Sequence, residues 1–138
     1  MTDPKLALKE LLESQWDKIG VGFTPKFSSD WYDAKEQMPQ VVVSQVLTQP
    51  RVIGFSSDPP SAQRRFEAAY AIDVLSKGDQ EKRYRMLKEV DRIIHSKCDA
   101  PGGGLEFAEA SSWTDLDEGD THPRLYRSRV HVEVLYYE

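Results

Sequence analysis

The fold is decided by residues 65–75, which read RFEAAYAIDVL. Every second residue from Phe66 to Val74 is apolar, whereas charged residues and alanines fill the positions between them. Side chains alternate between the two faces of a β-strand, so this period of two predicts a half-buried strand. The alanines would also suit a helix, but a helix would scatter the five apolar residues around its axis. We therefore expect a strand over Arg65–Leu75.

A helix is expected directly after that strand. Lys77, Gly78 and Asp79 form a turn signal, and aspartate is a good N-cap residue. Apolar residues then recur every three or four positions, which predicts an amphipathic helix over Asp79–Lys97. Glycines and a proline over Ala100–Gly104 end it. Its expected buried stripe comprises Met86, Leu87, Val90, Ile93 and Ile94.

Two further strands complete the C-terminal half. Leu105–Trp113 alternates weakly and Leu125–Tyr137 alternates clearly, so both predict strands. The acidic stretch Asp115–Pro123 is expected to be a solvated turn between them. On the last strand, one face carries Tyr126, Ser128, Val130, Val132, Val134 and Tyr136, and the other carries Arg127, Arg129, His131 and Glu133.

The N-terminal half predicts one helix and one clear strand. A capped start and an apolar stripe predict a helix over Asp3–Ile19, which Gly20 stops. Residues 21–40 are expected to be irregular. Val41–Thr48 is rich in β-branched residues and bounded by prolines, which predicts a strand. Arg51–Phe55 is either a short strand or a protruding loop tip.

Together these elements predict the fold class. Two strand pairs that flank a helix are typical of an α+β fold. Each helix has a single apolar stripe to bury, so we expect one domain over residues 1–138, a mostly antiparallel sheet with two helices packed on one face. The expected core includes Leu8, Leu12, Trp16, Leu87, Val90, Ile94, Tyr70, Ile72, Val130 and Val132.

The composition narrows the class of protein. With 18 basic and 23 acidic residues the formal net charge is −5, which argues against polyanion binding through bulk positive charge. No run approaches the roughly 20 apolar residues of a membrane helix, and no signal peptide is evident. Cys98 is the single cysteine, so no disulfide framework is expected. We predict a soluble intracellular domain with no membrane and no sequence-specific nucleic-acid partner.

No motif predicts catalysis or a cofactor. His95 and Cys98 lie three apart near a helix end, but zinc needs at least three protein ligands, and only His122 and its acidic neighbours could add to them. The run Asp115–Asp120 has its glycine fifth, whereas an EF-hand needs it sixth. Gly102–Gly104 follows a helix, the reverse of a phosphate-binding loop. We predict no catalytic residue, no metal and no cofactor.

The charged face of the last strand is the first candidate interaction surface. Arg127, Arg129, His131 and Glu133 project from it together. In one interpretation they pair with opposite charges on the neighbouring strand, which stabilises a sheet modestly. In the other they line a ring lumen or a subunit interface. The residues alone leave both interpretations open.

The loops supply a second candidate surface. Trp31, Val52, Ile53 and Phe55 are apolar residues within otherwise polar stretches, and Arg51 lies beside them. Single exposed apolar residues need no explanation, but a cluster of them in a long loop is typical of an interface. We therefore predict that this loop cluster contacts another protein.

The order of these features resembles one family. An amphipathic helix over Asp3–Ile19 opens the chain, and Val41–Leu47 follows a loop with aromatic residues. The helix Asp79–Lys97 lies between two strand pairs, and the Arg-x-Arg-x-His-x-Glu alternation of Arg127–Glu133 ends in Tyr136-Tyr137. This arrangement resembles the tail-terminator and tail-completion (head–tail neck) proteins of tailed bacteriophages and related tailed viruses.

The resemblance implies a structural virion protein rather than an enzyme. Members of that family form rings, commonly hexamers, that close the end of the tail tube and present a docking surface to the neck. The implied partners are further copies of the chain, the tail tube protein and a neck or connector protein. The implied location is the head–tail junction of the virion, after synthesis in the host cytoplasm.

Two other function classes stay open from the residues alone. One is a non-viral, cellular α+β domain that binds a ligand or a protein. The other is a small metal-dependent hydrolase built on His95, His122 and the acidic turn. The solution mass separates a ring from a monomeric domain, and metal analysis tests the hydrolase.

Overall fold

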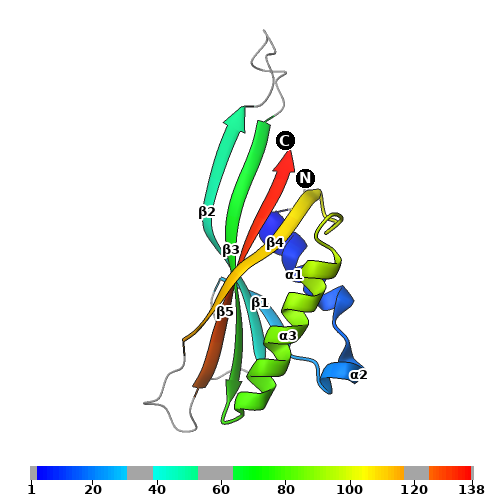
Figure 1. The fold of residues 1–138 in the computed structure, drawn as a ribbon, viewed down its shortest axis with the longest axis vertical. Coiled ribbons are helices and arrows are strands. Elements are labelled where there is room, and N and C mark those ends of the chain that lie inside the picture. Colours follow the sequence, from blue (N-terminus) through cyan, green and yellow to red (C-terminus); the bar gives the residue numbers. More distant parts are fainter. Residues whose placement is uncertain (1–2, 31–38, 53–63, 117–124, 138) are drawn as a thin grey trace.

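The computed structural model describes residues 3–30, 39–52, 64–116 and 125–137. A five-stranded sheet forms one layer and helices form the other (Figure 1). Every neighbouring strand pair except β1 with β2 is antiparallel, so the predicted α+β class with a mostly antiparallel sheet is confirmed. The sheet order is β1-β2-β3-β5-β4, with bounds β1 Lys26–Ser29, β2 Gln40–Val52, β3 Arg64–Lys77, β4 Leu105–Asp115 and β5 Leu125–Tyr137.

The strand β3 confirms the prediction made from its alternating sequence. Its apolar positions from Ala68 to Val74 are at most 4% exposed, and Phe66 packs against the same core. β3 pairs with β2 on one side and with β5 on the other along most of its length. Its backbone groups therefore find partners on both edges, which outweighs the helix propensity of its alanines.

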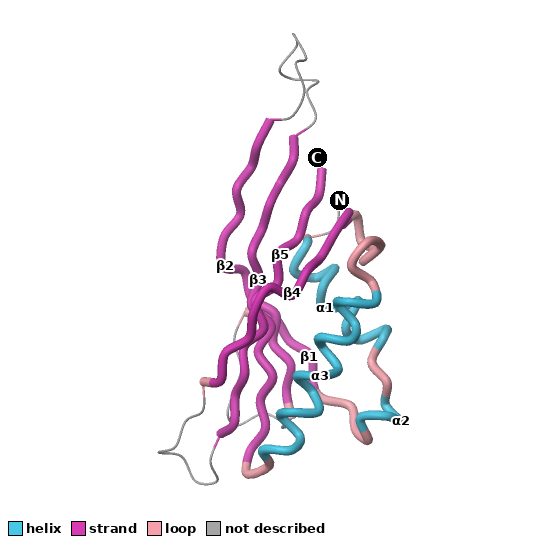
Figure 2. The backbone as a smooth tube through the Cα atoms, in the orientation of Figure 1, coloured by secondary structure: helices cyan, strands magenta, loops and turns pink. Residues whose placement is uncertain are grey.

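The helices α1 (Pro4–Gln15), α2 (Lys18–Val21) and α3 (Gln80–Ser96) gather on one face of the sheet (Figure 2). α1 contacts β1 and β2, whereas α3 contacts β3, β4 and β5. The predicted packing of two helices on one face is confirmed, and α2 adds a single turn. All ten residues of the expected core are buried, none more than 8% exposed. We call the opposite side of the sheet the helix-free face.

The end of the first helix differs from the prediction. α1 stops at Gln15, and Ile19, expected in the buried stripe, is 94% exposed. Trp16 is extended instead, and its indole Nε1 donates to the Phe23 carbonyl at 3.0 Å. Asp17 then starts α2 by accepting from the Gly20 amide at 2.9 Å. These tertiary and capping bonds replace the helical bonds lost at the break.

The prediction that Gly20 ends the first helix was also wrong, because the chain breaks earlier and starts a new helical turn. Gly20 lies inside α2, and the left-handed residue that ends the turn is Gly22, at φ 94°. The Asp17 amide also donates to Glu89 Oε2 of α3 at 2.6 Å. The break is thus held by a contact with a helix more than 60 residues away, which no local pattern in the sequence contains.

Two strand predictions need correction. β1 lies in the stretch expected to be irregular, and it pairs in parallel with Gln40–Val43. β2 runs through Pro50 to Val52, so Thr48 is not its end and Arg51 belongs to the strand. Beyond Val43, β2 has no described neighbour on its outer side, and a proline without an N–H is tolerated on such an edge.

The helix-free face is not purely polar. Val42, Leu75 and Leu125 form a second cluster of buried side chains there, each at most 3% exposed. Ala71, four residues before Leu75 in β3 and on the same face, is 1% exposed. The part of this face near the Lys77 end of β3 is therefore buried, whereas the part near the Arg64 end is accessible.

Candidate functional site

The charged residues of β5 do not all project freely. Arg127 donates from Nε and Nη2 to Asp73 Oδ2 at 3.0 and 2.6 Å. Arg129 donates from Nε to Asp73 Oδ1 at 2.8 Å and from Nη2 to Oδ2 at 3.1 Å. Arg129 is the direct cross-strand partner of Asp73 in the β3–β5 register. For these two arginines the structure realises the cross-strand pairing that was one of the two sequence interpretations.

Burial makes this cluster stronger than a surface ion pair. Asp73 is 5% exposed, and the side chains of Arg127 and Arg129 are 19% and 32% exposed. The hydrogen bond to Asp73 raises the pKa of Arg129 above its ordinary value, against the opposing effect of burial. Two guanidinium groups therefore share one buried carboxylate through charge-assisted hydrogen bonds.

His131 and Glu133 have a different environment. His131 is half-buried and Glu133 is exposed. The cross-strand neighbours of Glu133 are Ala69 on β3 and Glu109 on β4. Glu109 is also exposed, and neither carboxylate forms an ion pair with any residue in the described part of the chain. Like charges directly opposite each other destabilise a sheet, so this acidic pair is a local cost.

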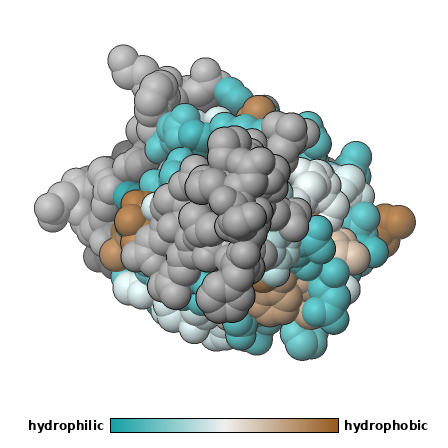
Figure 3. All heavy atoms as spheres, turned by 90° about the horizontal axis from the view of Figure 1, so that it is seen from above, coloured by the Kyte–Doolittle hydropathy of each residue, from teal (hydrophilic) through white to brown (hydrophobic). Residues whose placement is uncertain are grey.

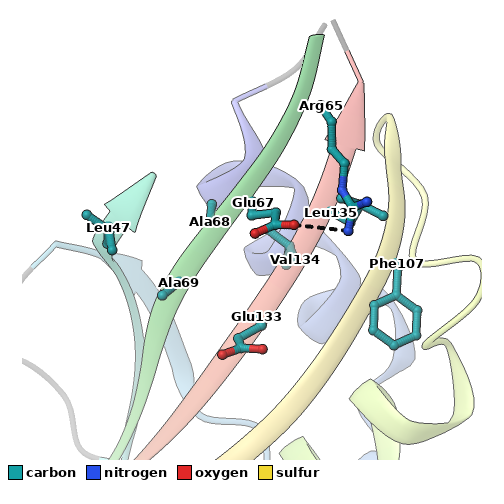
Figure 4. A pocket seen from close by; sticks show the side chains of 9 residues that line it. All are labelled: Leu47, Arg65, Glu67, Ala68, Ala69, Phe107, Glu133, Val134 and Leu135. Carbon is teal, nitrogen blue, oxygen red and sulfur yellow. Dashed lines mark ion pairs between the residues drawn. The ribbon is translucent and has the colours of Figure 1, made fainter. Parts of the chain in front are cut away.

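An open pocket lies beside this acidic pair. It holds about 330 Å³ and is lined by apolar and charged side chains from four strands (Figure 4). Arg65 and Glu67, both on β3, form an ion pair at 3.0 Å on the wall of this pocket (Figure 4). The Nε atom of Arg65 is buried and has no hydrogen-bond partner among the described residues. The apolar lining comes from Leu47, Ala68, Ala69, Phe107, Val134 and Leu135.

Two exposed apolar residues beside this pocket were not predicted from the sequence. Val46 and Leu47 are 58% and 51% exposed, although both lie inside a predicted strand. The register shifts between Gln45 and Leu47, so a β-bulge turns this pair outward. Two consecutive apolar residues that break the period of two were the available signal. β4 contains two similar shifts, which explains its weak alternation.

The predicted loop interface is mostly outside the described residues. Trp31, Ile53 and Phe55 fall in stretches that the structure does not describe. Arg51 and Val52 form the last two residues of β2, where only their backbone is described. The contact role of this loop therefore stays a prediction.

Of the residues considered for metal binding, the structure describes only some, among them His95, Cys98 and Asp115. His95 and Cys98 line a small cavity of about 130 Å³ between α3 and β4 together with Asp91. Within residues 3–30, 39–52, 64–116 and 125–137, no group of three or more His, Cys, Asp or Glu side chains could hold a metal ion. His122 lies outside those ranges.

None of the helices in the described part of the chain is long and apolar enough to cross a membrane.

Seen from above, the part of the surface that the structure describes carries many hydrophilic residues (Figure 3). Figure 3 shows its apolar atoms in separate patches rather than in one continuous area.

Comparison with known proteins finds a solved structure with a similar fold. No family model and no curated protein matches the chain. A chain from the solved virion of a native gene transfer agent (GTA) particle has the same fold, with a TM-score of 0.61 and 11% sequence identity. The match covers 98% of this chain and 95% of that chain. At this identity the likeness concerns the arrangement of helices and strands.

Proposed function

We propose that this protein is a structural component of a tailed, phage-like virion, where it closes the end of the tail tube and joins it to the head as a ring. The observation that carries the proposal is the match to a chain of the gene transfer agent virion over nearly the full length of both chains. Such coverage means that the two chains share the whole architecture rather than a common motif. The order of elements in the sequence independently resembles tail-terminator proteins.

The proposed role is structural rather than catalytic. In the strongest polar cluster of the helix-free face, Asp73 accepts hydrogen bonds from Arg127 and Arg129 within the sheet. The neighbouring surface offers exposed carboxylates and half-buried apolar side chains, which suit contact with another protein. The proposed partners are further copies of the chain in a six-fold ring, the tail tube protein and a neck or connector protein.

A gene-deletion experiment on the particles tests this function. We expect particles made without the gene to accumulate as unjoined heads and tails, and a wild-type copy supplied in trans to restore joined particles. Electron microscopy counts the joined particles, and mass spectrometry of purified particles detects the protein. A copy carrying Val132→Asp, which places a charge at a position that is 0% exposed, is the matched control that should not rescue.

Two results would contradict the proposal. The first is a normal yield of joined particles without the gene. The second is the absence of the protein from purified wild-type particles. Either result would favour the cellular α+β binding domain, for which the pocket on the helix-free face is the natural place to search for a ligand.

A further inference from the structure

The acidic pair on the helix-free face has no ion-pair partner among the described residues. Glu109 and Glu133 lie directly opposite each other on β4 and β5, both exposed. Half-buried Phe107 and Leu135 and half-exposed Leu47 lie beside them. A basic group from outside would remove the like-charge repulsion, and an apolar one would cover the pocket. We call Leu47, Phe107, Glu109, Glu133 and Leu135 the acidic sheet patch.

The outer surface of the helical layer has the complementary character. Lys82 and Lys88 of α3 have no carboxylate partner among the described residues, and their ammonium groups lie 5.5 Å from the Phe23 ring and 5.7 Å from the Tyr84 ring. Lys18 of the adjacent α2 is exposed and equally lacks one. These three lysines and the two exposed apolar residues Ile19 and Tyr84 form what we call the basic helix patch.

Two exposed apolar residues belong to the basic helix patch. Ile19 of α2 is 94% exposed and Tyr84 of α3 is 55% exposed. Among the acidic groups nearby, Glu81 pairs with Arg85 at 3.4 Å and Glu89 with Arg92 at 2.6 Å. Asp17 caps α2 by accepting from the Gly20 amide, and Asp91 is half-buried, so the three lysines still outnumber the two remaining carboxylates. The basic helix patch therefore comprises Lys18, Ile19, Lys82, Tyr84 and Lys88.

The two patches cannot meet within one molecule. α3 packs its buried side against β3, β4 and β5, so its outer surface points away from the sheet (Figure 1). The acidic sheet patch lies on the other side of those strands, as Figure 4 shows for Glu133 and Leu135. A contact between the patches must therefore join two copies, head to tail. Contacts of that kind close into rings when the rotation between copies is right.

We propose that the acidic sheet patch of one copy binds the basic helix patch of a second copy. The occupant is a second copy because the exposed, uncompensated charges of the two patches have opposite sign and both patches carry exposed apolar side chains. This inference rests on the proposed function, which requires contacts between copies, and it names the surfaces that make them.

Paired charge reversals test the contact in purified protein. One variant carries Glu109→Lys with Glu133→Lys, and the other carries Lys82→Glu with Lys88→Glu. We expect wild-type protein to self-associate at about 1 mM in sedimentation experiments, and each variant alone to associate at least ten-fold more weakly. Mixed together, the two variants should associate again, because each then offers a patch of the opposite sign to the other. Glu10→Lys with Glu13→Lys on α1 is the control of equal charge change.

Zero-length crosslinking detects the contact between the acidic sheet patch and the basic helix patch directly. A carbodiimide joins carboxylates to amines in contact, so we expect links from Glu109 or Glu133 to Lys18, Lys82 or Lys88. These links should appear only in crosslinked dimers or larger species. The same links inside monomers would contradict the placement of the patches on opposite sides of the molecule.

The outcomes also separate this inference from the proposed function. A wild-type protein that stays monomeric at about 1 mM, or reversal variants that associate normally, would overturn the inference. A mixture that fails to associate would do the same. Particles that contain the protein at the tail end while the reversal variants assemble normally would leave the proposed function intact and refute only the contact.

Discussion

Replacing Asp73 by alanine removes the carboxylate that holds two strands of the sheet together through side chains. Asp73 is 5% exposed and accepts four hydrogen bonds from Arg127 and Arg129. Removing one member of a buried ion pair costs about 3–5 kcal/mol because the remaining charge is left without a partner. The two arginine side chains are 19% and 32% exposed, so water compensates part of that loss, and we expect Asp73→Ala to cost about 2–4 kcal/mol.

Urea unfolding, followed by circular dichroism, measures this loss. With a typical slope of about 1–3 kcal/mol per molar urea, a loss of 3 kcal/mol lowers the midpoint by about 1–3 M. The double variant Asp73→Ala with Arg129→Ala should lose less than the sum of the two single variants, because both remove the same interaction.

The control for this prediction is Glu133→Ala on the same face. Glu133 is exposed and opposes Glu109, so its removal should change the free energy of unfolding by no more than about 0.5 kcal/mol or stabilise the protein slightly. The reasoning is refuted if Asp73→Ala shifts the midpoint no more than this control does.

Three further predictions concern the core, a helix cap and alkaline pH. Val132→Asp places a charge at a position that is 0% exposed, so it should unfold most of the protein at room temperature, as thermal melts would show. Asp79→Ala removes the acceptor for the Lys82 amide, 3.1 Å away, and should cost about 1 kcal/mol in urea unfolding. Burial, reinforced by Tyr136 and Asp3, raises the pKa of Tyr70 to about 12. The unfolded chain then loses its proton first, so stability should fall by about 1.4 kcal/mol per pH unit from pH 10 to 12, and Tyr70→Phe should abolish that slope; an unchanged slope would contradict it.

The alternating and helical patterns in the sequence determined the main architecture. The five apolar positions of β3 share one face because a strand projects every second side chain to the same side, and that rule needs no knowledge of neighbours. The stripe of α3 and its cap at Asp79 follow from equally local geometry. For this reason the α+β class, the faces of β3 and β5, and the ten expected core residues could all be predicted.

Features that depend on distant partners could not be predicted. The break after Gln15 is stabilised by the bond from the Asp17 amide to Glu89, which lies far away in the sequence. β1 is four residues long, too short for a periodic signal, and it exists because β2 provides its parallel partner. β2 continues through Pro50 because that part of the strand is an edge, a property of the whole sheet.

The candidate site also has one part that the sequence determined and another that only the tertiary structure decided. The sequence alone determined that Arg127, Arg129, His131 and Glu133 share one face of the last strand. Only the register between β3 and β5 decided that Asp73 would meet Arg129, and only the register between β4 and β5 set Glu109 against Glu133. Pairing register depends on bulges and on the packing of a whole face, so the sign of each local charge cluster was decided by the tertiary structure.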